Sequence, residues 1–236
     1  MTFKIMLAPM EGLTDAKFRT DCYRNGADLT FTEVARVANL ARRKKPELDR
    51  ISILDSTPTQ IQLAGARLDD YSKFLSGFKV EEGFMGFNLN LGCSSPEFIR
   101  QGIGCAMVKR VSRVSEIAKL IDKAGYECSI KMRLGVNDRE KDTKAYLNVI
   151  NNVDASFFVV HARTGYQTLD DPADFSVYPG CVDTGKRIVA NGDIKTRRQV
   201  LDLRAAGLYG AMIGRAAKSG PAARGHPEIF RELRAD

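Results

Sequence analysis

The stretch Cys128-Ser129-Ile130-Lys131-Met132-Arg133 is a run of strand length that carries two basic residues near its end. An amphipathic segment precedes it over residues 111–124, where apolar residues recur at intervals of three and four until Gly125 stops the pattern. A second helical segment begins after Thr196 as its N-cap and ends at Gly207. The local pattern therefore predicts strands that alternate with helices.

This alternation extends along the whole chain. Strands that alternate with helices form parallel sheets with right-handed crossovers. Eight such units within 236 residues predict an α/β fold, a (β/α)8 TIM barrel that forms a single domain over residues 1–236. The alternative is an open doubly wound sheet. The eight predicted strands are residues 4–10, 29–34, 59–63, 86–90, 128–133, 157–161, 187–191 and 210–214.

Polar residues stand at the end of each apolar run, where a strand in a core has no reason to carry them. In a barrel these ends converge on one rim, which is where enzymes of this fold place their active sites. In an open sheet they would spread along an edge, so the pattern favours the barrel. The residues are Glu11, Glu33, Gln62, Asn90, Lys131, Arg133, His161, Arg163, Asn191 and Arg215.

The formal net charge is +7, which suits an anionic partner such as nucleic acid or phosphate. The five cysteines form no C-x-x-C pair, which argues against a zinc site or a disulfide framework and indicates reduced thiols in a cytoplasmic protein. No signal peptide is recognisable, and no apolar run approaches the roughly 20 residues that span a membrane.

Seven motifs resemble those of the dihydrouridine synthase family, in the same order and at similar spacing from residue 4 to about residue 221. Each motif alone is weak, but together they cover nearly the whole chain. The motifs are Ala8-Pro9-Met10-Glu11-Gly12, Gln62-Leu63-Ala64-Gly65, Asn88-Leu89-Asn90-Leu91-Gly92-Cys93, Lys131-Met132-Arg133-Leu134-Gly135, His161-Ala162-Arg163-Thr164, Asn191-Gly192-Asp193-Ile194 and Met212-Ile213-Gly214-Arg215-Ala216.

The resemblance implies FMN as cofactor. A flavin phosphate needs backbone N–H groups and a cation, and the turns after the seventh and eighth strands offer both where barrels commonly bind phosphate. The resemblance places Lys131 beside the anionic edge of reduced flavin, with an ion pair to Glu33 as the alternative. The expected cofactor-binding residues are Pro9, Met10, Glu11, Gln62, Lys131, His161, Asn191, Gly192, Asp193, Gly214 and Arg215.

The resemblance also implies reduction of uridine to 5,6-dihydrouridine in RNA, with NADPH or NADH as reductant. Cys93 matches the family's general acid, since a thiol can supply a proton to C5 of the uracil. The resemblance places Lys131 and His161 in the catalytic set with Cys93. Asn90, Arg133 and Arg163 are expected to contact the substrate. The target uridine must leave its stack to reach the cofactor.

Two features depart from the family. Ser94-Ser95 separate Cys93 from Pro96, where the family usually has proline directly after the cysteine. The chain also stops soon after its eighth unit, without the helical domain with which most members grip tRNA. RNA binding would then come from the barrel rim, from a partner chain or a second copy, or not at all. Basic candidates for RNA contact are Arg36, Arg42, Arg43, Lys44, Lys45, Arg100, Lys109 and Arg110. For the densest run, residues 42–45, a solvated helix end is the alternative.

Two other functions remain open at this point. The chain could act on a free pyrimidine, in the manner of the dihydroorotate dehydrogenase barrels. It could also be a flavin-binding or RNA-binding protein without catalysis. Activity on small pyrimidines alone would indicate the first, and a flavin that NADPH never reduces would indicate the second.

Overall fold

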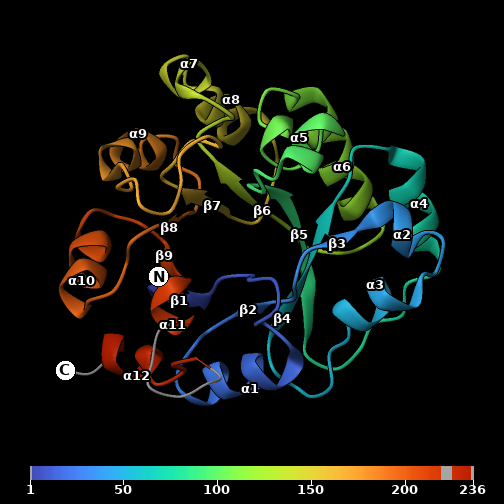
Figure 1. Cartoon of the computed structure of the whole chain (residues 1–236), viewed down its shortest axis with the longest axis horizontal. Coiled ribbons are helices and arrows are strands. Elements are labelled where there is room, and N and C mark those ends of the chain that lie inside the picture. The colour runs from blue at the N-terminus through green and yellow to red at the C-terminus, as the bar shows by residue number, and fades with distance from the viewer. Residues whose placement is uncertain (1, 219–224, 235–236) are drawn as a thin grey trace.

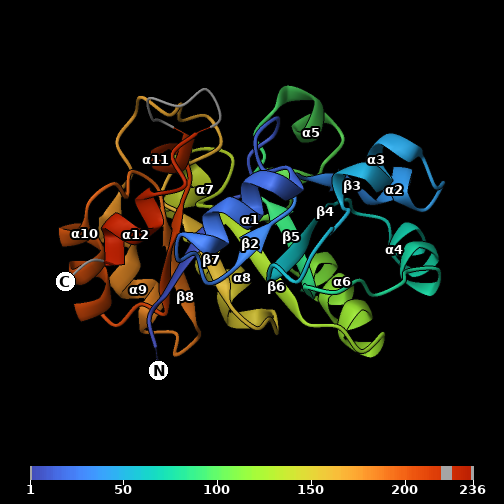
Figure 2. The same cartoon turned by 90° about the horizontal axis from the view of Figure 1, so that it is seen from below.

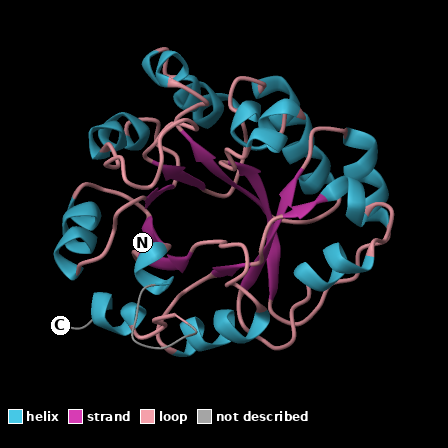
Figure 3. Cartoon of the chain, in the orientation of Figure 1, coloured by secondary structure: helices cyan, strands magenta, loops and turns pink. Residues whose placement is uncertain are grey.

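The computed structural model describes residues 2–218 and 225–234. A ring of parallel strands lies at the centre, and helices surround it (Figures 1 and 3). The strands are β1 (Lys4–Leu7), β2 (Thr30–Phe31), β3 (Ala35–Arg36), β4 (Thr59–Ala64), β5 (Phe84–Leu91), β6 (Cys128–Arg133), β7 (Phe158–His161), β8 (Ile188–Asn191) and β9 (Gly210–Ile213).

The helices connect these strands and cover the outside of the ring. They are α1 (Ala16–Arg24), α2 (Val37–Leu40), α3 (Lys45–Arg50), α4 (Leu68–Ser76), α5 (Pro96–Arg100), α6 (Val111–Lys123), α7 (Asp138–Asp142), α8 (Ala145–Asn152), α9 (Tyr178–Val182), α10 (Arg197–Ala205), α11 (Arg215–Lys218) and α12 (Ile229–Arg234), with 3-10 turns at Gly104–Met107 and Phe175–Val177. No helix within the described ranges is long and apolar enough to cross a membrane.

The predicted barrel is confirmed. The strand order is β1-β9-β8-β7-β6-β5-β4-β2, with every pair parallel. A bridge between Met6 and Leu29 closes the ring, where the Leu7 N–H donates to the Leu29 carbonyl at 3.0 Å. The helices α5 and α11, which follow β5 and β9, lie at the same end of the barrel (Figure 2).

The predicted strand at residues 29–34 is shorter than expected. Only Thr30–Phe31 pairs with β4 as a strand, and a separate short strand, β3, pairs with β4 further along. Thr32 explains the break, because its hydroxyl accepts the Gln62 N–H at 3.0 Å in place of a backbone carbonyl. The side chain ends the backbone ladder at this position, which a pattern of hydrophobic residues cannot reveal.

The barrel interior has one apolar side and one polar side. An apolar cluster fills the side formed by β7, β8, β9, β1 and β2. On the opposite side, alternate residues of β4, β5 and β6 pack outward against the helices, which leaves the intervening polar residues facing inward. The apolar cluster is Met6, Ala8, Phe31, Phe157, Val159, Val189 and Met212, and the inward polar residues are Gln60, Gln62, Asn88, Asn90, Ser129 and Lys131.

A bulge at Gly86 sets which residues of β5 face inward. Thr59 pairs with Phe84 and Ile61 with Phe87, so β5 carries one extra residue at this point. Gly86 has φ +107°, and a Cβ there would lie 2.6 Å from the Glu127 carbonyl oxygen. A slip of one residue would exchange the two faces of β5 and turn Asn88 and Asn90 away from the interior.

Gly86→Ala is expected to lower the free energy of unfolding by about 2–3 kcal/mol, because the new Cβ meets the Glu127 backbone at an unfavourable φ. Gly185→Ala is the matched control, since Gly185 has φ +72° but open space around the new Cβ. Chemical denaturation measures both. Equal losses in the two variants would show that the bulge tolerates a side chain.

Candidate active site

A cavity of about 310 Å³ opens at the carboxyl ends of the strands. All fifteen residues predicted for the site line it, although they come from the carboxyl ends of seven strands, β1 and β4 to β9, and from the loops that follow them. The polar residues predicted at the strand ends therefore surround one cavity, except Glu33, which does not line it. The lining consists of Ala8, Pro9, Met10, Glu11, Val34, Gln62, Asn90, Gly92, Cys93, Lys131, Arg133, His161, Arg163, Leu169, Asn191, Gly192, Asp193, Ile194, Lys195, Met212, Gly214, Arg215 and Ala216.

The turns after β8 and β9 form one end of the cavity. Gly192 and Asp193 both have positive φ, at +118° and +51°. A side chain does not fit at Gly192, because a Cβ there would lie 2.9 Å from the Ala173 Cβ. Among the described residues, nothing accepts a hydrogen bond from the backbone N–H groups of Gly192, Asp193 or Gly214. This end therefore presents unused donors to the cavity.

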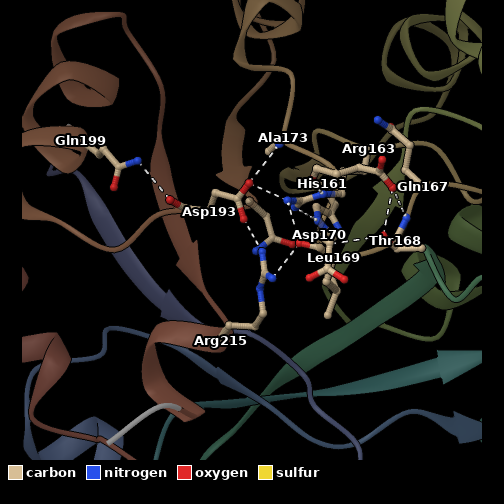
Figure 4. A network of polar contacts seen from close by, with 12 residues as sticks. His161, Arg163, Gln167, Thr168, Leu169, Asp170, Ala173, Asp193, Gln199 and Arg215 are labelled. Atoms are coloured by element: carbon tan, nitrogen blue, oxygen red, sulfur yellow. Dashed lines mark hydrogen bonds and ion pairs between the residues drawn. The ribbon is translucent and has the colours of Figure 1, made fainter.

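Asp193 holds two arginines beside these donors (Figure 4). Its carboxylate forms ion pairs with Arg163, at 2.5 Å, and with Arg215. The Arg215 Nη1 also donates to the Leu169 carbonyl at 2.7 Å. Arg215 is 38% exposed, so its guanidinium remains open to the cavity and to solvent.

Arg163 is buried, with 1% of its surface exposed. Its guanidinium donates to the carbonyls of Asp171, at 2.7 Å, and Leu169, at 3.4 Å. It also contacts His161 Nε2 at 3.1 Å. These contacts hold the loop of residues 164–171 over the cavity. All the recorded contacts of the Arg163 guanidinium are with groups of the protein, so a contact between Arg163 and the substrate stays a prediction.

Arg133 has a similar arrangement on the neighbouring strand. Its Nη1 donates to the carbonyls of Thr164, at 2.5 Å, and Gln167, at 3.0 Å. The same loop is thus fastened at both ends by arginines from β6 and from the end of β7. A direct substrate contact of Arg133 stays a prediction.

Lys131 brings an ammonium group into the cavity without a protein partner. It forms no hydrogen bond or ion pair with any described residue. The alternative partner, Glu33, is bound to Arg50 at 3.0 Å and to the Gly12 N–H. Burial, reinforced by the neighbouring Arg133 charge and opposed by Cys93, lowers the pKa of Lys131 to about 8.

His161 is a neutral ring. Burial and the surrounding cations, Lys131 first among them, lower its pKa to about 2. Because a guanidinium can only donate, the His161 Nε2 accepts from Arg163 and the proton resides on Nδ1. The site thus contains a histidine that can donate a hydrogen bond from Nδ1 but carries no charge.

Cys93 lies on the loop after β5 and is the one described cysteine that is not buried. Asn90 Oδ1 accepts the N–H groups of Gly92, at 3.1 Å, and Cys93, at 2.9 Å. The Cys93 carbonyl accepts the Cys105 N–H at 2.9 Å. The backbone of Cys93 is therefore fixed on both sides while its thiol reaches the cavity.

Ser95, directly before Pro96, has a structural role. Ser95 is the N-cap of α5, where its hydroxyl accepts the Phe98 N–H and Pro96 follows as the first helical residue. The Cys93 Sγ lies 3.7 Å from the Ser95 Oγ. Ser94-Ser95 thus lead the chain into the helix without displacing the cysteine from the cavity.

The Pro9-Met10-Glu11 stretch lines the cavity beside Gly214, because it follows β1, which pairs with β9. A Cβ on Gly214 would lie 4.0 Å from the Met10 Sδ. Glu11 is exposed and pairs with Arg50 at 3.1 Å.

Leu169 and Lys195 also line the cavity but were not predicted from the sequence. Lys195 directly follows a recognised motif, but Leu169 lies in a loop without any periodic signal.

The fold and this cavity define a TIM-barrel protein with a cation-rich site at the face where enzymes of this fold carry out their reactions. The model of the dihydrouridine synthase (Dus) family matches residues 6–232. The chain belongs to this family.

Curated relatives are similar over nearly the whole chain. tRNA-dihydrouridine synthase B of Pseudomonas putida is 31% identical, with 97% of this chain and 67% of that protein covered. A probable tRNA-dihydrouridine synthase of Rickettsia conorii is 28% identical, with 94% and 68% covered. tRNA-dihydrouridine synthase B of Escherichia coli is 27% identical, with 98% and 71% covered.

Solved structures support the fold. N-(5'-phosphoribosyl)anthranilate isomerase from Pyrococcus furiosus superposes with a TM-score of 0.55 at 11% identity, covering 98% of this chain and 96% of that chain. Nitroalkane oxidase from Streptomyces ansochromogenes gives 0.53 at 15% identity, covering 90% and 65%. At these identities the likeness concerns the barrel architecture alone.

Lys131→Met is expected to stabilise the cofactor-free protein by about 2–3 kcal/mol at pH 7, because it removes a charge whose pKa falls from 10.5 to about 8 on folding. Below pH 8 Lys131 is charged in the folded state, so the full cost of desolvating this charge lowers the free energy of unfolding of the wild type. Between pH 8 and 10.5 the unfolded state binds more protons, so wild-type stability rises with pH. The gap between variant and wild type should therefore shrink over that range.

Urea denaturation at pH 7 and at pH 10 measures the effect. Lys119→Met is the control, since Lys119 lies exposed on α6. A variant less stable than wild type at pH 7 would mean that Lys131 has a favourable partner.

Proposed function

We propose that this chain reduces uridine to 5,6-dihydrouridine in tRNA, with FMN bound in the barrel cavity and NADPH or NADH as reductant. Membership of the dihydrouridine synthase family indicates an oxidoreductase of the tRNA-dihydrouridine synthase type. The observation that carries the proposal is that the Cys93 loop and the unpaired Lys131 ammonium open on the same cavity.

The residues of the cavity fit FMN. The unused N–H groups at Gly192, Asp193 and Gly214 lie beside Arg215, which is the donor set that a phosphate monoester needs. At the other side, the ammonium of Lys131 suits the negative charge that a reduced flavin carries. Gln62 offers one remaining N–H, since its other amide positions bind Asn88 and Asn90.

FMN would supply the hydride that adds to C6 of the uracil. Cys93 would donate its thiol proton to C5, and solvent would then return a proton to the sulfur. His161 Nδ1–H would hold a carbonyl oxygen of the ring or of the cofactor without adding a charge. The remaining N–H of Asn90 would orient the uracil beside Cys93.

Cys93→Ala is expected to lower dihydrouridine formation by about 10²- to 10⁴-fold, because general-acid catalysis of this kind contributes that much. Bound flavin should remain, since the backbone contacts of Cys93 do not require the thiol. Nucleoside mass spectrometry of an unmodified tRNA transcript incubated with protein and NADPH gives the product yield.

Cys181→Ala is the matched control, because this thiol is buried away from the cavity. Full activity in Cys93→Ala would exclude Cys93 as the acid. Turnover of free uracil, uridine or dihydroorotate but not of tRNA would replace the RNA substrate with a small pyrimidine. A reducible flavin with no product on any substrate would call for a partner chain that holds the RNA.

We further propose that the segment Arg42-Arg43-Lys44-Lys45 contacts the RNA backbone. These residues are exposed at the α2–α3 connection and have no acidic partner among the described residues. Two other candidates are engaged, since Arg36 binds Glu97 at 2.7 Å and Lys109 binds Glu140 at 3.6 Å. An unopposed cationic segment is what phosphate contacts require.

The double variant Arg42→Glu/Lys45→Glu is expected to weaken tRNA binding about tenfold or more at low salt and to flatten its salt dependence. Lys119→Glu/Lys123→Glu on α6 changes the net charge equally and is the control. Filter binding over a series of salt concentrations measures both. The same loss in the two variants would reduce the effect to overall charge.

A further inference from the structure

We propose that Gln60, Asn88 and Ser129 are positioning residues that hold the Cys93 loop from inside the barrel. None of the three lines the cavity. All are buried, with at most 1% of their surface exposed. The proposal rests on the function proposed above only in taking Cys93 as the reacting group.

A continuous chain of hydrogen bonds joins these residues to the cavity floor. Asn90 Nδ2 donates to Gln62 Oε1 at 2.8 Å, and Gln62 Nε2 donates to Asn88 Oδ1 at 2.7 Å. Asn88 Nδ2 then donates to Ser129 Oγ at 2.7 Å. The chain therefore passes from β5 to β4, back to β5 and on to β6, deep into the interior.

The other end of this series of hydrogen bonds also reaches a backbone group, the Met85 carbonyl. Ser129 Oγ donates to Gln60 Oε1 at 2.5 Å, and Gln60 Nε2 donates to the Met85 carbonyl at 3.2 Å. Met85 precedes the bulge at Gly86. The chain thus connects the bulge near the start of β5 with the loop that follows the end of the same strand.

The two ends fix the direction of every bond between them. A backbone N–H can only donate, so Asn90 must present Oδ1 to Cys93 and Nδ2 to Gln62. Each following amide is oriented by the one before it, until Ser129 must donate to Gln60. The Met85 carbonyl can only accept, which agrees with this direction. No amide in the chain can rotate alone without placing two donors or two acceptors in contact.

Hydrogen bonds aligned in one direction polarise one another, and breaking a buried one leaves both partners unsatisfied. Loss of the Ser129 hydroxyl therefore affects Asn88 and Gln60 at once. Asn88 can then rotate, which frees Gln62 and Asn90 in turn. The consequence reaches the N–H of Cys93, although Ser129 does not touch the Cys93 loop.

The test compares Ser129→Ala, which removes the hydroxyl, with Ser129→Thr, which keeps it. Thr30→Val is the matched control, because Thr30 is another buried hydroxyl in the barrel. It is bound to Thr59 at 2.8 Å and takes no part in the series of hydrogen bonds described above. Hydrogen exchange of a peptide over residues 89–95, read by mass spectrometry on the full chain, reports the protection of the Gly92 and Cys93 amides.

Exchange of these two amides should rise about tenfold or more in Ser129→Ala and stay near wild type in Ser129→Thr and Thr30→Val. The kcat for dihydrouridine formation should fall about tenfold in Ser129→Ala through misplacement of the loop, with flavin reduction by NADPH unchanged. Unprotected amides in wild type, retained protection in Ser129→Ala or equal deprotection in Thr30→Val would each overturn the proposal. Absence of dihydrouridine from wild type would overturn the proposed function instead, and the exchange data would still decide whether the chain of bonds holds the loop.

Discussion

The carboxylate of Asp193 is the contact on which the architecture of the site depends. It binds Arg163 and Arg215 together, and both arginines reach the carbonyl of Leu169 on the loop over the cavity. A single acid thereby joins the end of β8 to the ends of β7 and β9. Its positive φ, next to a glycine with no space for a side chain, directs the carboxylate toward these partners.

Asp193 balances only part of the charge around it. Lys131 and Arg133 face the same cavity without a carboxylate partner among the described residues. Burial is the main reason why His161 stays neutral, and the positive potential adds to it, since a further positive charge would be repelled from several sides. A cavity of this kind favours an anionic ligand and raises the stability of the protein when one binds.

The sequence was sufficient to predict the barrel, and the fifteen residues predicted for the site all line one cavity. Alternating strand and helix patterns are local, and the barrel topology by itself brings all carboxyl strand ends to one rim. The sequence was not sufficient to predict which partners the polar side chains bind. The burial of Arg163, the hold of Asp193 on two arginines and the break in the ladder at Thr32 all depend on contacts between residues far apart in the chain. The bulge at Gly86 is equally hidden, because it is defined against β4 and the Glu127 backbone.

The hydrogen bond between the Cys93 carbonyl and the Cys105 N–H closes a loop that leaves the barrel after Cys93 and returns to the same point. The segment between Cys93 and Cys105, which includes α5, is therefore a loop whose two ends are held together by a hydrogen bond. The entropy of closing such a loop grows only slowly with its length. The loop can therefore be lengthened or replaced while Cys93 keeps its position at the end of β5. The outer part of the loop can vary in length and sequence without moving Cys93.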